Sequence, residues 1–379
     1  MGRRRRRTRP GRHRHRPPVT STAATGHDRP PRPATPGSEL PRTGAGTRRR
    51  VGRVAGLAGG LCLLAVVCVL SLFIGSAALD PEQVIAALTG SADPVTRATV
   101  LEMRLPRTLL GVLVGAALGV AGALAQALTR NPLADPGILG VNAGAGLAVA
   151  LAVAFFGVTT IDGYVWFAFV GALLSFALVY AIALRGPHGA TPVRLTLIGV
   201  ALTAVFTGIS QSLELVLPRV FDQMRFWGVG SIADRPAGTV AFVAPFIVVG
   251  LVMALATGRA VNAIALGDDR ARSLGVPVGL VRGASALAIT VLCGAATAAA
   301  GPIAFVGLMV PHAVRLVSGP DQRWIMAHSV VAAPVLLVVA DIFGRLVVWP
   351  AELRVGVVTA LLGAPVLIWL VRRAERGGL

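Results

Sequence analysis

A chain of 379 residues that is 54% hydrophobic and only 14% charged, with a mean hydropathy of +0.72, has the composition of a polytopic membrane protein rather than of a soluble domain. The net charge of +19 is concentrated at the start, since residues 1–53 hold 16 arginines against Asp28 and Glu39. Every basic residue is an arginine. A phosphate-binding loop of the Walker type requires a lysine, so this chain contains none, and any ATP that powers it is hydrolysed by another subunit.

Residues 1–50 are predicted to form a disordered cytoplasmic tail, because they are rich in Arg, Pro, Gly and Thr and poor in large apolar side chains. The run from Arg3 to Arg7 would suit nucleic acid or anionic lipid. A solvated tail that reinforces membrane topology is the simpler interpretation, and we expect no nucleic-acid partner. Residues 51–379 are predicted to form one transmembrane domain.

Apolar segments of membrane length repeat along this domain and predict an all-α fold with ten transmembrane helices. Gly301-Pro302 alone separates the seventh span from the eighth, so a count of nine is the alternative. The ten predicted spans are Val54–Ala78, Leu109–Leu128, Ile138–Val158, Tyr164–Leu184, Leu195–Leu217, Thr239–Thr257, Ala284–Ala300, Ile303–Val317, Ile325–Ile342 and Val355–Val371.

Arginines before the first span (48–50 and 53) and after the last (372, 373 and 376) predict that both termini are cytoplasmic. With ten spans, the arginines of the remaining connections are only weakly biased toward the cytoplasmic side. Eight arginines fall on the outer side, where the positive-inside rule does not account for them. They are Arg97, Arg104, Arg107, Arg219, Arg225, Arg235, Arg345 and Arg354.

The second span carries Gly111, Gly115 and Gly119 on one helical face, where a neighbouring helix can approach closely. This row is interpreted as helix packing beside a pore. The turn that follows contains Asn131 and Pro132 and is expected on the cytoplasmic side. Asp135 and the proline after it suit the cap and first position of the third span.

The longest cytoplasmic connection, 258–282, is predicted to contain a short helix from Asp268 to Leu274, ended by Gly275. A second short helix is expected from Val278. The connection carries both acidic and basic residues (Asp268, Asp269, Arg270 and Arg272), which makes a helix lying on the membrane surface less suitable. These elements are therefore interpreted as a rigid contact for another subunit.

Pro302 and Pro311 interrupt apolar sequence, which is tolerated where protein or water satisfies the freed backbone groups. Asp341 and Arg345 are four residues apart, so they either pair along one helix or Arg345 faces outward toward an acidic partner. Glu214 is an alternative partner for this arginine.

Several segments, in this order along residues 54–373, resemble the FecCD family of permeases from type II ABC importers for iron–siderophore complexes, haem and cobalamin. They are Arg104-Leu105-Pro106-Arg107, residues 131–136 with Gly140, residues 265–267, residues 273–275, residues 301–308 with Pro311 and His312, Ala340-Asp341, and residues 356–359 with 363–365.

This resemblance implies a ten-helix permease that pairs with a second copy or a paralogue, two cytoplasmic ATPases and an extracytoplasmic binding protein. It implies that Arg104, Arg107 and Arg345 receive acidic residues of that binding protein. It also implies that a coupling segment docks on the ATPase, with the residues Gly267, Asp268, Asp269, Arg270, Ser273, Leu274 and Gly275.

Two features depart from the family pattern: the N-terminal extension, and Arg354 where the family has a proline before the last span. The expected function is uptake of an iron–siderophore, or of haem or cobalamin, across the cell membrane. An ion-gradient-driven secondary transporter is the alternative and would need midplane ionisable residues. We expect no catalytic residues, no cofactor and no metal site, since the three cysteines match no ligand spacing.

Overall fold

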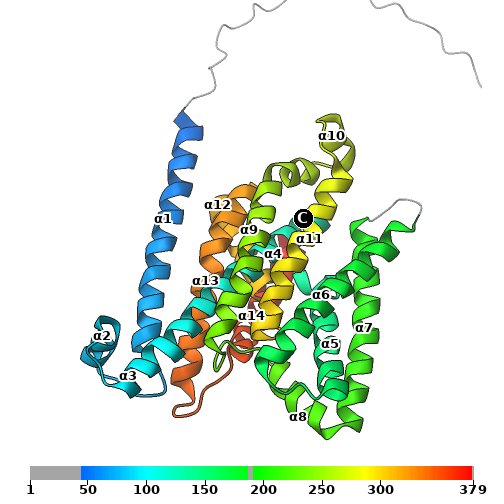
Figure 1. Ribbon diagram of the computed structural model, residues 1–379. Helices are drawn as coiled ribbons and strands as arrows, with labels where there is room; N and C mark the ends of the chain where they lie inside the picture. Colours follow the sequence, from blue (N-terminus) through cyan, green and yellow to red (C-terminus); the bar gives the residue numbers. More distant parts are fainter. Residues whose placement is uncertain (1–43, 187–190, 378–379) are drawn as a thin grey trace, which may run out of the picture. The chain divides into compact units, whose positions relative to one another are not determined.

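The computed structural model describes residues 44–186 and 191–377, and the regular elements in these ranges are all helices (Figure 1). The all-α fold class expected from the sequence agrees with this architecture. Most of the predicted tail, including Arg3–Arg7, lies outside the described residues. Residues 47–379 form one compact unit.

Seven of the described helices are long and apolar enough to cross a membrane. They are α1 (Gly44–Phe73), the continuous helix made of α3 (Pro94–Ala98), η1 (Thr99–Arg104) and α4 (Leu105–Thr129), α6 (Ile161–Leu184), α7 (Pro192–Val216), α9 (Ala237–Ala265), α11 (Val278–Ala300) and α13 (Gln322–Val347). Shorter apolar helices occupy three more of the predicted spans: α5 (Val141–Phe156), α12 (Val306–Ser318) and α14 (Val355–Gly377). The chain is therefore a multi-pass membrane protein, and the count of ten spans stays a prediction.

Four short helices connect these elements: α2 (Pro81–Thr89), η2 (Pro136–Leu139), α8 (Pro218–Trp227) and α10 (Asp268–Ser273). The prediction of a second short helix from Val278 is wrong. Val278 and Val281 are buried and form the first turn of the long helix α11, because their packing continues that of the apolar residues that follow. The sixth span was also predicted too short, since α9 continues to Ala265.

Helix α4 lies at the centre of the bundle. In the apolar stretch of α3–α4, 83% of the residues are buried, against 17% in α7 and 11% in α1. Its glycine row lies against α13: a Cβ atom on Gly115 would lie 2.6 Å from the Cα of Pro334, and one on Gly119 would lie 2.5 Å from the Cβ of Ala333. Because glycine has no side chain, α4 can lie close to α13 at these positions.

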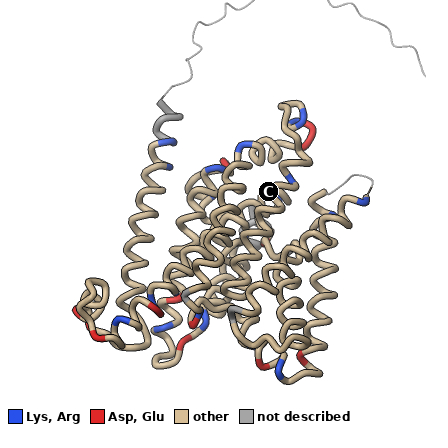
Figure 2. The backbone as a smooth tube through the Cα atoms, viewed as in Figure 1, with Lys and Arg blue, Asp and Glu red and all other residues tan. Residues whose placement is uncertain are grey.

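Charged residues gather at the two ends of the bundle and are sparse between them, as Figure 2 shows. We call the end at which α4 begins the Arg107 end and the end at which it finishes the Arg130 end. α8 lies at the Arg107 end and α10 at the Arg130 end (Figure 1). An apolar middle between two charged ends is the distribution that a bilayer requires.

Candidate functional site

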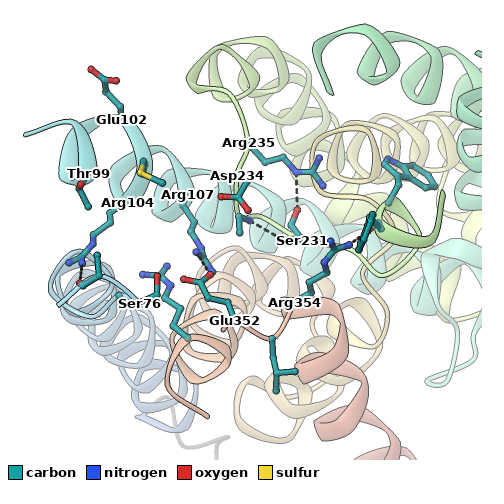
Figure 3. A pocket seen from close by; sticks show the side chains of 18 of the residues that line it. Ser76, Thr99, Glu102, Arg104, Arg107, Ser231, Asp234, Arg235, Glu352 and Arg354 are labelled. Atoms are coloured by element: carbon teal, nitrogen blue, oxygen red, sulfur yellow. Dashed lines mark hydrogen bonds and ion pairs between the residues drawn. The ribbon is translucent and has the colours of Figure 1, made fainter. Parts of the chain in front are cut away.

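A cavity of about 720 Å³ lies at the Arg107 end. Its walls come from η1 and the start of α4, the end of α8, the segment 231–235 and the loop 352–354 (Figure 3). Five arginines and three acidic residues contribute to the lining. They are Arg104, Arg107, Arg235, Arg345, Arg354, Glu102, Asp234 and Glu352.

Arg104 is nearly buried, with 5% of its surface exposed. Its guanidinium donates hydrogen bonds to the carbonyls of Leu72 (2.7 Å), Phe73 (3.1 Å) and Ala77 (2.6 Å). The last carbonyls of a helix have no partner within the helix and carry partial negative charge, and the last turn of α1 holds no basic residue of its own. Arg104 thus caps α1 from a different helix.

Arg345, which is 2% exposed, caps the same helix end from α13. It donates to the carbonyls of Ser71 (2.9 Å) and Ile74 (2.8 Å) and forms an ion pair with Asp341, one turn earlier. The prediction that Arg345 pairs with Asp341 along one helix is confirmed. The alternative of an outward-facing Arg345 is wrong, because the helix end, Asp341 and the surrounding packing enclose its guanidinium.

Arg107 occupies the centre of this network. Its Nε and Nη2 atoms donate to both oxygens of Asp341, at 3.0 and 2.8 Å, and Nη1 donates to Glu352 at 2.7 Å. Its side chain is 14% exposed, against 2% for Asp341 and 25% for Glu352. Such two-pronged contacts are the strong form of arginine–carboxylate pairing. Arg107 is therefore held by a buried carboxylate on one side and by an accessible one on the other.

Partial burial raises the pKa of the Glu352 carboxyl, but the charge and hydrogen bond of Arg107 outweigh it, so that the pKa is lowered overall. Glu352 stands in the loop between α13 and α14, outside the membrane-spanning helices. It is consequently ionised at neutral pH and neutralises Arg107 from the cavity side.

Arg235 and Arg354 differ from Arg107 and Arg345, because neither forms an ion pair with an acidic side chain of the described residues. Arg235 donates to the Ser231 carbonyl (3.1 Å) and to the Tyr164 hydroxyl (3.0 Å). Arg354 donates to the carbonyl of Phe226, and its guanidinium lies 4.6 Å from the centre of the Phe226 ring. Sequence reasoning listed both among the outer arginines, and it singled out Arg354 as a departure from the family pattern that adds positive charge to the docking face.

A second ion-pair network lies at the Arg130 end. Asp268, the first residue of α10, contacts Arg130 at 2.5 Å and Arg282 of α11 at 2.9 Å. Arg130 ends α4 in the left-handed conformation, with φ of 51°, and also donates to the Ile264 carbonyl at 2.7 Å. Asp268 thus joins the ends of α4, α9 and α11 to α10. No local pattern in the sequence indicates these partners, since Arg130 is 138 positions away from Asp268.

The other residues of the expected coupling segment lie on α10 or at its ends. Gly267 (φ 113°) and Gly275 (φ 77°) adopt backbone conformations that favour glycine and bound the helix on either side. Between them, most side chains face solvent, namely those of Asp269, Arg270, Arg272, Ser273 and Leu274, whereas Ala271 is buried. α10 therefore presents an exposed surface for a contact.

The proline-containing segments lie in different places: Asn131 and Pro132 at the Arg130 end, and Pro302 against Gly230, next to the segment that lines the cavity. Asn131 and Pro132 form an exposed turn, in which the Asn131 side chain accepts from the Leu133 amide at 2.9 Å. Asp135 caps η2 through the Gly137 amide at 2.8 Å. The cap predicted for the third span therefore begins a separate short helix, and α5 begins after Gly140. Pro302 precedes α12, and Pro311 lies within it. These contacts show local structure, and a role in the pore stays a prediction.

Among the described residues, no group of three or more His, Cys, Asp or Glu side chains is placed to hold a metal ion. The cavity at the Arg107 end is lined by five arginines against three carboxylates, so its chemistry favours binding of an anion over coordination of a metal.

Known proteins resemble this chain along most of its length. The model of the FecCD transport family matches residues 63–373. The ferric enterobactin transport system permease protein FepD of Escherichia coli is 48% identical over 328 residues, which cover 86% of this chain and 98% of FepD. The iron(3+)-hydroxamate import system permease protein FhuB of Bacillus subtilis is 41% identical over 332 residues, 87% of this chain and 86% of FhuB. A solved structure of a metal-chelate type ABC transporter in an inward-facing conformation matches with a TM-score of 0.75 and 27% identity, covering 84% of this chain and 98% of that one.

Proposed function

Because the chain belongs to the FecCD transport family, we propose that it is the permease subunit of an ABC importer and moves an iron–siderophore or a related metal chelate across the cell membrane. The observation that carries the proposal is the extent of the match, which runs over residues 63–373 and reaches every apolar helix described above. The relatives named for iron chelates match over most of their own length.

The two charged ends suit different partner subunits of such an importer. Under the positive-inside rule, the arginines in the first turns of α1 (48–50 and 53) favour a cytoplasmic position for the Arg130 end, where the exposed surface of α10 would contact an ATPase subunit. The Arg107 end then faces outward, toward an extracytoplasmic binding protein. A second copy of this chain or a paralogue would complete the pore, and two ATPase subunits would power it.

The three arginines predicted to receive the binding protein play different parts in this proposal. Arg107 is the one with an exposed carboxylate partner, Glu352, which an acidic side chain of the binding protein would replace. Arg104 and Arg345 hold the end of α1 and support the docking face without touching the partner. The proposed docking contact is therefore made by Arg107, and Arg104 and Arg345 position the surface around it.

The decisive experiment reconstitutes the permease with its ATPase and binding protein in liposomes and measures uptake of radioactive iron chelate. Uptake should require ATP and persist when a protonophore removes the proton gradient. Uptake that continues without ATP but stops with the protonophore would instead establish the ion-gradient-driven alternative.

A further inference from the structure

Arg235 and Arg354 face the same cavity at the Arg107 end, and neither is neutralised by a carboxylate of the described chain (Figure 3). Arg107 and Arg345 are neutralised, because they share Asp341 and Arg107 also contacts Glu352. Arg104 has no carboxylate partner, but it is nearly buried and its guanidinium donates to three carbonyls. Among the lining arginines of the described residues, those that are partly exposed and have no carboxylate partner are therefore Arg235 and Arg354.

Both guanidinium groups are held in place by neutral partners. Arg235 uses two of its nitrogen atoms on the Ser231 carbonyl and the Tyr164 hydroxyl, and Arg354 is fixed by the Phe226 carbonyl and ring. Each keeps at least one terminal nitrogen without a partner in these contacts. Two guanidinium groups that are already held in place, each with unused N–H donors, form an arrangement that binds oxyanions.

The two arginines also repel each other. Burial lowers the pKa of the Arg354 guanidinium, the nearby charge of Arg235 lowers it further, and Asp234 partly offsets both. Asp234 nevertheless forms no ion pair with either arginine within the described residues. An anion placed between the two guanidinium groups would remove this repulsion, which is a gain that a neutral ligand cannot supply.

The size of the cavity distinguishes between two sources of such an anion, a small-molecule chelate and a carboxylate of a docked protein. A volume of about 720 Å³ falls in the range of roughly 300–1,000 Å³ typical of small-molecule sites. One carboxylate of a docked protein would fill a small part of it. Phe226, which is 51% exposed, adds apolar surface beside the cations, whereas Trp227 and Tyr164 are nearly buried. This surface suits a chelate with aromatic or carboxylate arms.

We infer that Arg235 and Arg354 form a binding site for an anionic metal chelate, such as a ferric catecholate or carboxylate complex, at the outer mouth of the permease. The inference rests on the proposed function and narrows it, since it selects negatively charged chelates over neutral ones. The site holds the cargo when it leaves the binding protein and raises its concentration beside the pore.

The test measures binding without transport. The permease–ATPase complex in lipid nanodiscs, without binding protein, is dialysed against radioactive ferric tris-catecholate, which carries three negative charges. Saturable binding is expected, and Arg235→Gln or Arg354→Gln should each weaken it by roughly tenfold, as for loss of one charge-assisted contact. Arg97→Gln, which alters an exposed arginine outside the cavity, is the matched control and should bind normally. A neutral ferric tris-hydroxamate should not compete.

Equal binding by the variants, or equal competition by the neutral chelate, would overturn the inference. In a second arm, chelate-free binding protein is titrated onto the same complexes. If the two variants weaken that contact and leave chelate binding unchanged, the arginines belong to the docking face and the inference is wrong. Arg235→Gln alone suffices if Arg354→Gln disturbs folding. Failure of the wild-type complex to transport any ferric chelate would contradict the proposed function instead, since the dialysis does not depend on transport.

Discussion

Arg107 and Arg130 lie at opposite ends of α4, and each forms an ion pair with a distant part of the chain: Arg107 with Asp341 of α13 and Arg130 with Asp268 of α10. Helix α4 is buried along most of its length and packs against α13, α11, α9 and α12. A stiff helix that is held at both ends by ion pairs is suited to connect the cavity at the Arg107 end with the exposed surface of α10. This relationship motivates the predictions that follow.

Asp341→Asn should destabilise the protein strongly, because it leaves Arg107 and Arg345 buried with too little negative charge. Removing one partner of a buried ion pair lowers the free energy of unfolding by about 3–5 kcal/mol. Thermal unfolding of the detergent-solubilised protein, followed by tryptophan fluorescence, measures the change. The control is Asp222→Asn, whose carboxylate is 63% exposed and pairs with Arg225; its effect should stay below about 1 kcal/mol. Similar midpoints for the two variants would show that the Asp341 network contributes little to stability.

Asp268→Asn should uncouple ATP hydrolysis from uptake, since it releases α10 from both Arg130 and Arg282. ATPase activity should persist in reconstituted liposomes, while the iron taken up per ATP hydrolysed falls several-fold. The neighbouring Asp269 is a close control, because its side chain is 98% exposed and contacts only Arg272 on the same helix. If Asp269→Asn changed coupling as much as Asp268→Asn does, the anchoring of α10 would not be the cause.

Gly122→Ala should weaken the packing of α4 on α12. A Cβ atom at this position would overlap the carbonyl of Gly307, and such overpacking typically costs about 1–3 kcal/mol. Gly59 of α1 has no atom within 4 Å of an added Cβ, so Gly59→Ala should leave stability unchanged or raise it by up to about 1 kcal/mol. Unfolding midpoints of the two variants check the difference, and an unaffected Gly122→Ala variant would mean that α12 can move away at little cost.

The ion pair of Glu352 with Arg107 should make the Arg107 end sensitive to acid. Since the pKa of Glu352 is lowered in the folded protein, its stabilising effect is complete above the ordinary value of about 4.3 and is lost as the pH falls through the lowered pKa. Unfolding midpoints measured from neutral to acid pH should fall less steeply for Glu352→Gln than for the wild type. Parallel curves would assign the acid sensitivity to other carboxylates.

Sequence reasoning identified local relationships at both ends of the bundle. The spacing of Asp341 and Arg345 indicated a pair along one helix, and the pattern from Asp268 to Gly275 indicated a short capped helix. Both are present. The same reasoning treated Arg345 as a possible surface residue, since nothing in its neighbourhood shows that the end of α1 covers it. It also missed Gly122, whose partner Gly307 lies on another helix.

The sequence by itself determined that this protein is a multi-pass helical membrane protein without a Walker-type phosphate loop, because the bilayer imposes long apolar segments and such a loop requires a lysine. Only the tertiary structure decided which charges neutralise one another. Asp341 meets Arg107 across 234 positions of the chain, and Arg235 and Arg354 come to line one cavity. Such pairings follow from how closely the helices approach, which depends on the packing of all of them together, so no single segment encodes which arginines remain without a carboxylate.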